Sequence, residues 1–430
     1  MNKAAKQAAI GLALVLMLLA GVIPVQAAIT GLTGTAFDLV AREGYISTAD
    51  GSSIYSWGYA SGAGRMQYPG PTLIVNQGAT ITVTLRNELP APAGNVSIVF
   101  PGHAATASGG VAGKLTQEAP PGGVTTVTYT FTAANPGTYS YHSGTNVGLQ
   151  VDMGMVGAII VRPAGFDAMN PTAYGHADSQ YTYENLFLLT EMDVPMHNAV
   201  ASGIATGAIN VDTTAFFPVT WFINGRSAPD TMLADGVPWL PHQPYGAMAM
   251  MHPADRVLLR LVGGGRDMHP FHHHGNNSLA IARDGKLLES APGLGADLAV
   301  SDFTITVLPG GTVDAIFTWT GEKLGWDIYG HLVTDPLEPG EYAPDHGKPL
   351  PVQLPSDLEV TFGGQWSGSP FLGGGGSLPP GEGGLNPNGG YFFMWHSHNE
   401  KEMVNFDIFP GGMMTHVLIE HPSVMLMEGN

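Results

Sequence analysis

Residues 68–90 read YPGPTLIVNQGATITVTLRNELP, and this stretch decides the fold class. Within it, residues 80–85 alternate threonine with isoleucine, valine and leucine, which places the apolar side chains on one face of an extended strand. Glycine, proline and asparagine flank the alternation, as is typical of short strands joined by turns. Similar runs occur at residues 125–132 and, more apolar, at residues 157–161. Residues 28–163 therefore predict an antiparallel β-sandwich.

A second β-rich region follows a polar segment with little periodicity, residues 164–184, which we predict to be a linker. The second domain is expected to span residues 185–430. Its predicted strands share short runs of apolar and β-branched residues: 185–190, 256–262, 303–308, 313–318, 391–395 and 414–420. Residues 335–389 are rich in proline and glycine and too long for an ordinary loop, which indicates a functional lid or an insertion. No sustained amphipathic helix pattern is evident, so the chain is predicted to be all-β.

The first residues predict export. Lys3 and Lys6 precede an apolar run over residues 10–23, and small residues around Ala27 suit a cleavage site. We therefore expect residues 1–27 to be a signal peptide and the protein to be periplasmic in a bacterium, or secreted. No later segment approaches about 20 unbroken apolar residues, so no membrane anchor is predicted.

Charge and cysteine content narrow the function classes. The formal net charge is −19, and it becomes −21 without Lys3 and Lys6, which argues against binding to nucleic acid or to anionic membranes. The chain has no cysteine, so disulfides, thiolate metal sites, cysteine nucleophiles and iron–sulfur clusters are excluded. Its 16 histidines and 19 methionines are the remaining candidates for soft or borderline metal ligands.

Two histidine motifs point to a metal site. Residues 269–275 read HPFHHHG, and in an extended segment His272 and His274 point to one side while His273 points to the other. His396 and His398, in the run FFMWHSH, share a face in the same way. Four neutral imidazoles from two strands are a donor set for copper, with zinc as the alternative. Two such pairs in one all-β domain favour metal binding over chance surface histidines.

The chain resembles the multicopper oxidases, the cupredoxin-fold family that includes laccases and is related to copper nitrite reductases. Residues 68–90 resemble the opening strands of that family's first domain. The resemblance extends to GTYSYHSG through MGMVGAIIV, FING, HPFHHHG and FFMWHSH followed by GGMM, at residues 137–161, 222–225, 269–275 and 392–414. It implies two cupredoxin-like Greek-key β-sandwich domains, copper as the cofactor and His142 as a further metal ligand from the first domain.

The departures from the family pattern bear on function. The first copper motif is replaced by Val99-Phe100-Pro101-Gly102, and the second keeps only His142. Ser397 stands where the family has the blue-copper cysteine, and Glu402 falls where a later histidine is usual. His269 is then the only surviving residue of the blue site. Because a blue-copper centre needs a thiolate, the relay that feeds electrons one at a time to an oxygen-reducing cluster is predicted to be absent.

The sequence leaves three functions open. The protein is an oxidoreductase with a mono- or dinuclear site and an unknown small-molecule substrate, a non-catalytic copper-handling protein, or a degenerate cupredoxin scaffold. Two-domain relatives often form trimers, so the resemblance also allows a homo-oligomer. No catalytic residue is assigned. The predicted metal ligands are His142, His272, His274, His396 and His398.

Overall fold

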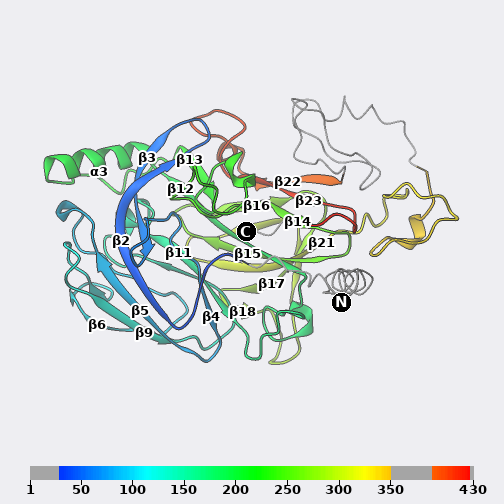
Figure 1. Ribbon diagram of the computed structural model, residues 1–430, viewed down its shortest axis with the longest axis horizontal. Coiled ribbons are helices and arrows are strands. Elements are labelled where there is room, and N and C mark those ends of the chain that lie inside the picture. The colour runs from blue at the N-terminus through cyan, green and yellow to red at the C-terminus, as the bar shows by residue number, and fades with distance from the viewer. Residues whose placement is uncertain (1–28, 350–389, 427–430) are drawn as a thin grey trace, which may run out of the picture.

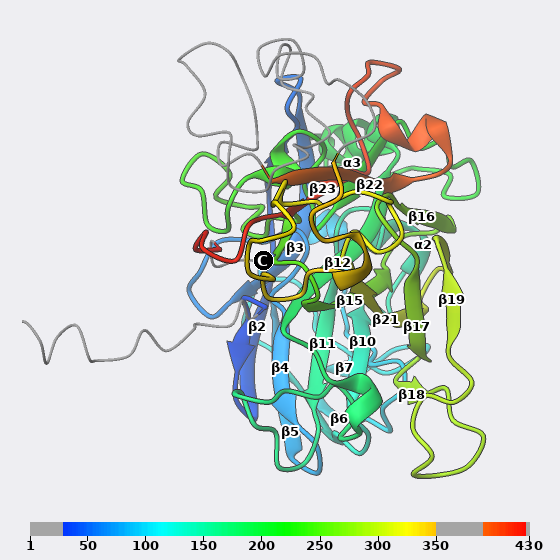
Figure 2. The same ribbon diagram turned by 90° about the vertical axis from the view of Figure 1, so that its right-hand side faces the viewer.

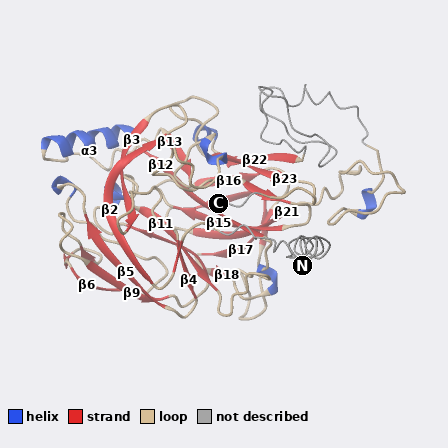
Figure 3. Ribbon diagram, viewed as in Figure 1, coloured by secondary structure: helices blue, strands red, loops and turns tan. Residues whose placement is uncertain are grey.

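The computed structural model describes residues 29–349 and 390–426. The predicted signal peptide and residues 350–389 of the predicted insertion lie outside the described residues. The predicted all-β class is confirmed, because strands dominate the described part of the chain and stack in layers (Figures 1 and 3). No helix in that part is long and apolar enough to cross a membrane.

Two sheets enclose an N-terminal core. One has the strand order β3-β2-β5-β9-β6, the other has the order β1-β4-β11-β10, and β7 and β8 form a separate pair. The strands are β1 (Leu32–Thr33), β2 (Ala36–Ser47), β3 (Ser53–Ser61), β4 (Leu73–Asn76), β5 (Thr80–Asn87), β6 (Thr106–Gly109), β7 (Val111–Ala112), β8 (Gln117–Glu118), β9 (Val127–Thr132), β10 (Gly137–His142) and β11 (Val156–Arg162). In β5 the alternation places Ile81, Val83 and Leu85 in the core, as the threonine pattern predicts.

Two further sheets enclose the C-terminal core. One has the order β13-β12-β15-β21-β17-β18, with β19 on β17, and the other has the order β14-β23-β22-β16-β20. The strands are β12 (Tyr183–Met192), β13 (Thr220–Ile223), β14 (Ala249–Met251), β15 (Arg256–Gly263), β16 (His269–His273), β17 (Ser278–Arg283), β18 (Lys286–Leu287), β19 (Val300–Asp302), β20 (Thr304–Val307), β21 (Thr312–Thr318), β22 (Tyr391–Ser397) and β23 (Met414–Ile419). The sheet with β16, β22 and β23 lies along one face of the molecule (Figure 2).

Helices are few in the described residues. The α-helices are α2 (Val147–Gln150) and α3 (Val194–Thr206), and the short 3-10 helices are η1 (Ala91–Ala93), η2 (Ala177–Ser179), η3 (Asp230–Met232), η4 (Ala343–Asp345) and η6 (Glu400–Met403). Helix α3 forms although the sequence shows no sustained amphipathic helix pattern. The Asp193 carboxylate caps this helix by accepting from the Met196 amide, and Gly207 ends it at φ 89°. The buried His197 ring of this helix forms hydrogen bonds with the backbone carbonyls of Tyr55 and Asp152.

A buried polar network joins the two halves of the chain. Glu184 on β12 accepts hydrogen bonds from Arg162 and Arg260, and Arg260 also donates to the Thr138 hydroxyl on β10. Thr138 in turn donates to Asp314 on β21 at 2.6 Å. Burial opposes ionisation of Glu184, but the two guanidinium charges outweigh it and lower its pKa to about 2. This network fixes β10, which ends at His142, against the sheet of β15 and β21.

Candidate metal centre

The pairing of β16 with β22 brings the two histidine motifs together. In this antiparallel pair His272 lies opposite His396, and His273 lies opposite Trp395. His274 and His398 follow the strand ends, and the pairing continues through them. The His274 amide donates to the Met394 carbonyl at 3.1 Å, and the His398 amide donates to the Pro270 carbonyl at 2.7 Å. Because side chains opposite each other project from the same face, the four rings share one side of the sheet.

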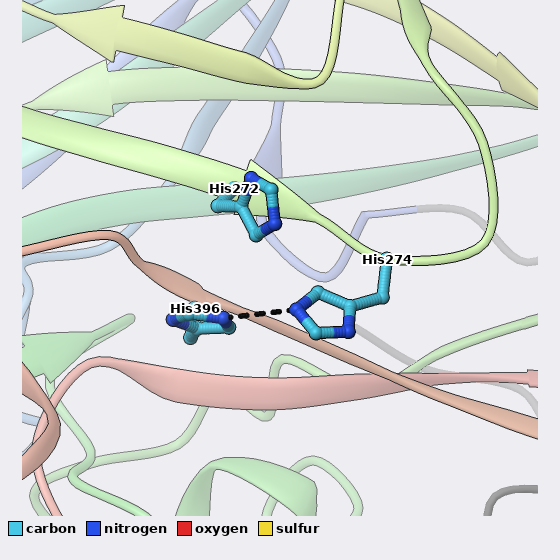
Figure 4. Close-up of side chains that lie close together, drawn as sticks. All are labelled: His272, His274 and His396. Atoms are coloured by element: carbon cyan, nitrogen blue, oxygen red, sulfur yellow. Dashed lines mark hydrogen bonds between the residues drawn. The ribbon is translucent and has the colours of Figure 1, made fainter. Parts of the chain in front are cut away.

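The imidazoles form a compact cluster. One nitrogen from each of His272, His274 and His396 lies within 4.8 Å of the others (Figure 4). The His274 and His396 Nε2 atoms face each other at 3.2 Å. The His398 ring centroid is 4.6 Å from that of His272 and 5.9 Å from that of His396. Four of the five predicted ligands therefore lie together, a spacing that one or two metal ions could bridge.

Hydrogen bonds on the far side of the rings select the nitrogens available to a metal. The His396 Nδ1–H donates to the Ser397 carbonyl at 2.7 Å, and the His272 Nδ1 contacts the Thr304 hydroxyl at 2.7 Å. With Nδ1 protonated, His396 directs its Nε2 lone pair towards the cluster, and a His272 Nδ1–H that donates to Thr304 does the same. Such outer hydrogen bonds orient metal-bound histidines.

The surroundings keep three of the four rings neutral. Burial, and then the proximity of the neighbouring imidazoles, lowers the pKa of His272 and of His274. Burial lowers the pKa of His396 to about 4. Neutral imidazoles carry the lone pairs that copper requires, so the donor set fits the copper that the family resemblance implies. His274 and His398 are exposed, so the cluster can be reached from solvent.

His273 lies on the other face of β16, as strand alternation predicts. It is 2% exposed and packs edge-on against Phe271 and Trp395. Neither ring nitrogen has a hydrogen-bond partner, and burial lowers its pKa to about 3. The side chain acts as a core aromatic and not as part of the histidine cluster.

His273→Phe should therefore raise the free energy of unfolding, because it removes two buried polar atoms without partners. We expect a gain of about 1 kcal/mol, with copper affinity unchanged. Urea unfolding and copper titration measure the two quantities. The matched variant His272→Phe should instead weaken copper binding. Equal losses of affinity in both variants would contradict the strand-alternation argument.

His142 lies outside the cluster within this chain. It ends β10, and its Nδ1 contacts the Ser143 carbonyl at 2.9 Å, which leaves Nε2 free. Val99, at the position of the lost first copper motif, pairs with it through backbone hydrogen bonds of 2.9 and 3.2 Å. His103 does not substitute for the lost ligands, since its ring packs against Phe131 and Tyr139 and burial lowers its pKa to about 4.

His269, which the resemblance places in the blue-copper motif, belongs to an ion triad. His269 is fully buried, and its Nε2 and Nδ1 contact Glu191 at 2.9 Å and Glu402 at 2.8 Å. Burial opposes the charged ring, but the two carboxylates outweigh it and raise the pKa of His269 to about 9. Both nitrogens are thereby committed to donation, and neither is free to bind copper. Glu402, at the position of a usual ligand, has become the partner of a protonated histidine.

Two residues near the site, Glu191 and His416, were not predicted from the sequence. Glu191 comes from β12, distant in sequence, and no local motif marks it. His416 on β23 lies opposite Met394, and its Nδ1 is 2.6 Å from the Met232 sulfur. Burial, then the charges of His274 and His396, lowers its pKa to about 3. A lone histidine in an apolar strand gives no signal of its own.

Comparison with known proteins agrees with this architecture. A family model described as "Multicopper oxidase" matches residues 59–165. The blue copper oxidase of Nitrosomonas europaea is 20% identical with a TM-score of 0.55, covering 90% of this chain and 85% of its own. The multicopper oxidase mgLAC is 18% identical with a TM-score of 0.56, covering 91% and 87%. The copper nitrite reductase of N. europaea is 16% identical with a TM-score of 0.50, covering 93% and 99%.

No curated protein matches the chain. At these identities the structural likeness establishes the fold, which is the predicted β-sandwich cupredoxin fold, and the family match covers the first part of the chain. Copper is the cofactor that this family implies. The matches therefore show a cupredoxin fold in a cysteine-free chain, with a multicopper oxidase segment at residues 59–165.

Proposed function

We propose that the protein is an exported copper-binding oxidoreductase whose metal is held by His272, His274, His396 and His398, without a blue-copper centre. The observation that carries the proposal is the convergence of three imidazole nitrogens within 4.8 Å, with the fourth ring beside them. An all-imidazole donor set suits copper better than it suits the hard cations. The division into domains at residues 164–184 and the signal peptide belong to the same proposal.

His142 completes the predicted ligand set from the other domain. Because it lies outside the cluster within one chain, we place it at the cluster of a second copy in a homo-oligomer. Its free Nε2 at the end of β10 supports this role. The trimer is the form that the family resemblance allows.

The residues in and around the cluster have separate roles. Copper, when bound, supplies one-electron redox chemistry. The Ser397 carbonyl and the Thr304 hydroxyl orient two of the rings. Exposed His274 and His398 leave the site accessible to a small molecule. Since Ser397 offers no thiolate and His269 is held by two carboxylates, electrons would pass directly between the site and its substrate.

Copper-loaded protein should lack the intense thiolate-to-copper absorption band of blue copper proteins. It should also fail to oxidise phenols at the rate of a laccase, because no relay exists. Absorption spectroscopy and an oxygen-uptake assay with a phenol check both points. A strong blue colour would overturn the assignment of Ser397.

Non-catalytic copper handling is the second candidate. The open rim of the cluster favours it, because a carrier must release its metal to a partner. The two candidate functions are distinguished by reducing the copper-loaded protein with a panel of small reductants and reoxidising it in air over repeated cycles. Sustained turnover supports the oxidoreductase, whereas copper transfer to a chelating acceptor without turnover supports handling.

A further inference from the structure

A second group of side chains of metal-ligating type lies in residues 319–349, the described segment that follows β21. The segment is drawn in yellow in Figure 1 and includes η4. Ile328 and Tyr329 anchor it, since both are buried in the C-terminal core. Asp327, next to this anchor, approaches three side chains from later in the segment, namely His331, Glu341 and His346.

The distances within this group match a four-coordinate site. One ligand atom from each residue lies within 4.8 Å of the others. The His331 Nδ1 is 3.6 Å from Asp327 Oδ2 and 3.4 Å from Glu341 Oε2. The His346 Nδ1 is 3.5 Å from Asp327 Oδ2 and 2.6 Å from Glu341 Oε1. Metal–ligand bonds of about 2.0–2.2 Å in a tetrahedron separate neighbouring ligand atoms by roughly 3.4 Å. Three of the four distances are near that value.

The hydrogen bonding leaves nitrogen lone pairs directed into the group. The His346 Nε2–H donates to the Asp335 carbonyl at 3.0 Å, so in the neutral ring the Nδ1 lone pair faces Glu341. The His331 Nδ1 is buried and has no hydrogen-bond partner. Groups that face one another at these distances need a positive charge between them, which a bound cation or a proton on an imidazole nitrogen supplies. The carbonyl that holds His346 is also the kind of outer contact that orients metal-bound histidines.

Burial separates this group from an ordinary surface cluster. The side chains of Asp327 and Glu341 are 0% and 2% exposed, and those of His331 and His346 are 18% and 13% exposed. Asp327 is further fixed by the amides of Tyr329 and Gly347, at 2.8 and 2.7 Å. Two carboxylates held away from water at this spacing repel each other unless a positive charge lies between them.

We propose that Asp327, His331, Glu341 and His346 form a structural site for a divalent transition-metal cation of the Zn²⁺ class. Two imidazole nitrogens and two carboxylate oxygens fill a tetrahedral shell, as in closed structural sites. The ion would tie the segment that leads towards β22 to the C-terminal core. The site uses none of the cluster histidines, so it stands independently of the proposed copper chemistry.

The test uses the full chain, stripped of metal with a chelator and titrated with Zn²⁺. To remove competition from the other cluster, all proteins carry His272→Ala and His398→Ala. This background should bind one equivalent of Zn²⁺ and gain thermal stability with it. Adding His331→Ala and His346→Ala should abolish both effects while leaving the metal-free melting temperature near that of the background. Adding His176→Ala, a half-buried histidine 3.5 Å from Asp178, should leave Zn²⁺ affinity unchanged.

Glu341→Gln in the same background covers the case in which the alanine variant fails to fold. It keeps the side-chain size but removes a charged ligand, and Zn²⁺ affinity should fall at least tenfold. If the background binds no Zn²⁺, or if the variants retain its affinity and thermal shift, the four residues are an ion-pair cluster and the proposal is wrong.

Discussion

Replacing His272 and His398 together with alanine is expected to abolish most copper binding. His272 lies on β16 and His398 directly follows β22, and their ring centroids are 4.6 Å apart, so their loss leaves only His274 and His396 in the cluster. Changes to outer contacts of a metal site cost about 10–100-fold in affinity. Removing two direct ligands should exceed that, and should remove the stabilisation that copper gives to the folded state. Copper titration and thermal unfolding with and without copper measure both effects.

Three single variants make this result specific. His142→Ala should weaken binding less than the double variant, because four imidazoles remain, and its effect should require the oligomer. His176→Ala, which removes a histidine paired with Asp178, should leave affinity unchanged. His273→Phe should also leave it unchanged. If no variant alters affinity, the histidine cluster does not hold the copper, and the scaffold interpretation becomes the better one.

Stability should fall as pH rises from 6.5 to about 9, and the His269 triad is the cause. The folded-state pKa of His269, about 9, lies above its ordinary value of 6.5. The charged ring therefore stabilises the fold fully below pH 6.5, and this contribution is lost as the pH approaches 9. Integrated over that shift, the loss is up to about 3 kcal/mol. Urea unfolding at a series of pH values measures it.

His269→Gln should flatten this pH dependence, since an amide does not titrate. It should also destabilise the protein at neutral pH, by about 3–5 kcal/mol, because Glu191 and Glu402 lose a buried counter-charge. His273→Phe is the matched control. Its histidine is equally buried in the same strand, but its pKa of about 3 keeps it neutral throughout the window. If the free energy of unfolding falls equally steeply with rising pH in His269→Gln and in the wild type, the triad does not control this pH dependence.

The sequence predicts strands well where neighbouring residues carry the burial pattern, whether on one face, as in β5, or on both, as in β21. Consecutive residues alternate between threonine and apolar side chains in β5 and form an apolar run in β21. The predicted bounds of both strands differ from the observed ones by two residues or fewer. Helix α3 has no such signal, because proline and glycine interrupt its apolar pattern. Its formation depends on the Asp193 cap and on the contacts of His197 with distant backbone. Tertiary contacts therefore decide what local propensity leaves open.

The same division holds for the site. Alternation along β16 and β22 predicts which rings converge, because the geometry of a strand is local. The partners of His269 could not be predicted, since Glu191 reaches it from a strand 78 residues earlier. The Asp327 group also lies in a segment without periodicity, where only the folded chain brings its side chains together.

Pulsed electron paramagnetic resonance of the copper-loaded wild type is the most direct test of the central claim. The technique detects the remote nitrogens of imidazoles bound to Cu(II). A site built from His272, His274, His396 and His398 predicts modulation from several equivalent imidazoles. The His272→Ala and His398→Ala double variant should lose the part of this modulation that does not depend on His331 and His346. A spectrum without imidazole modulation, or one that the double variant leaves unchanged, would contradict the account.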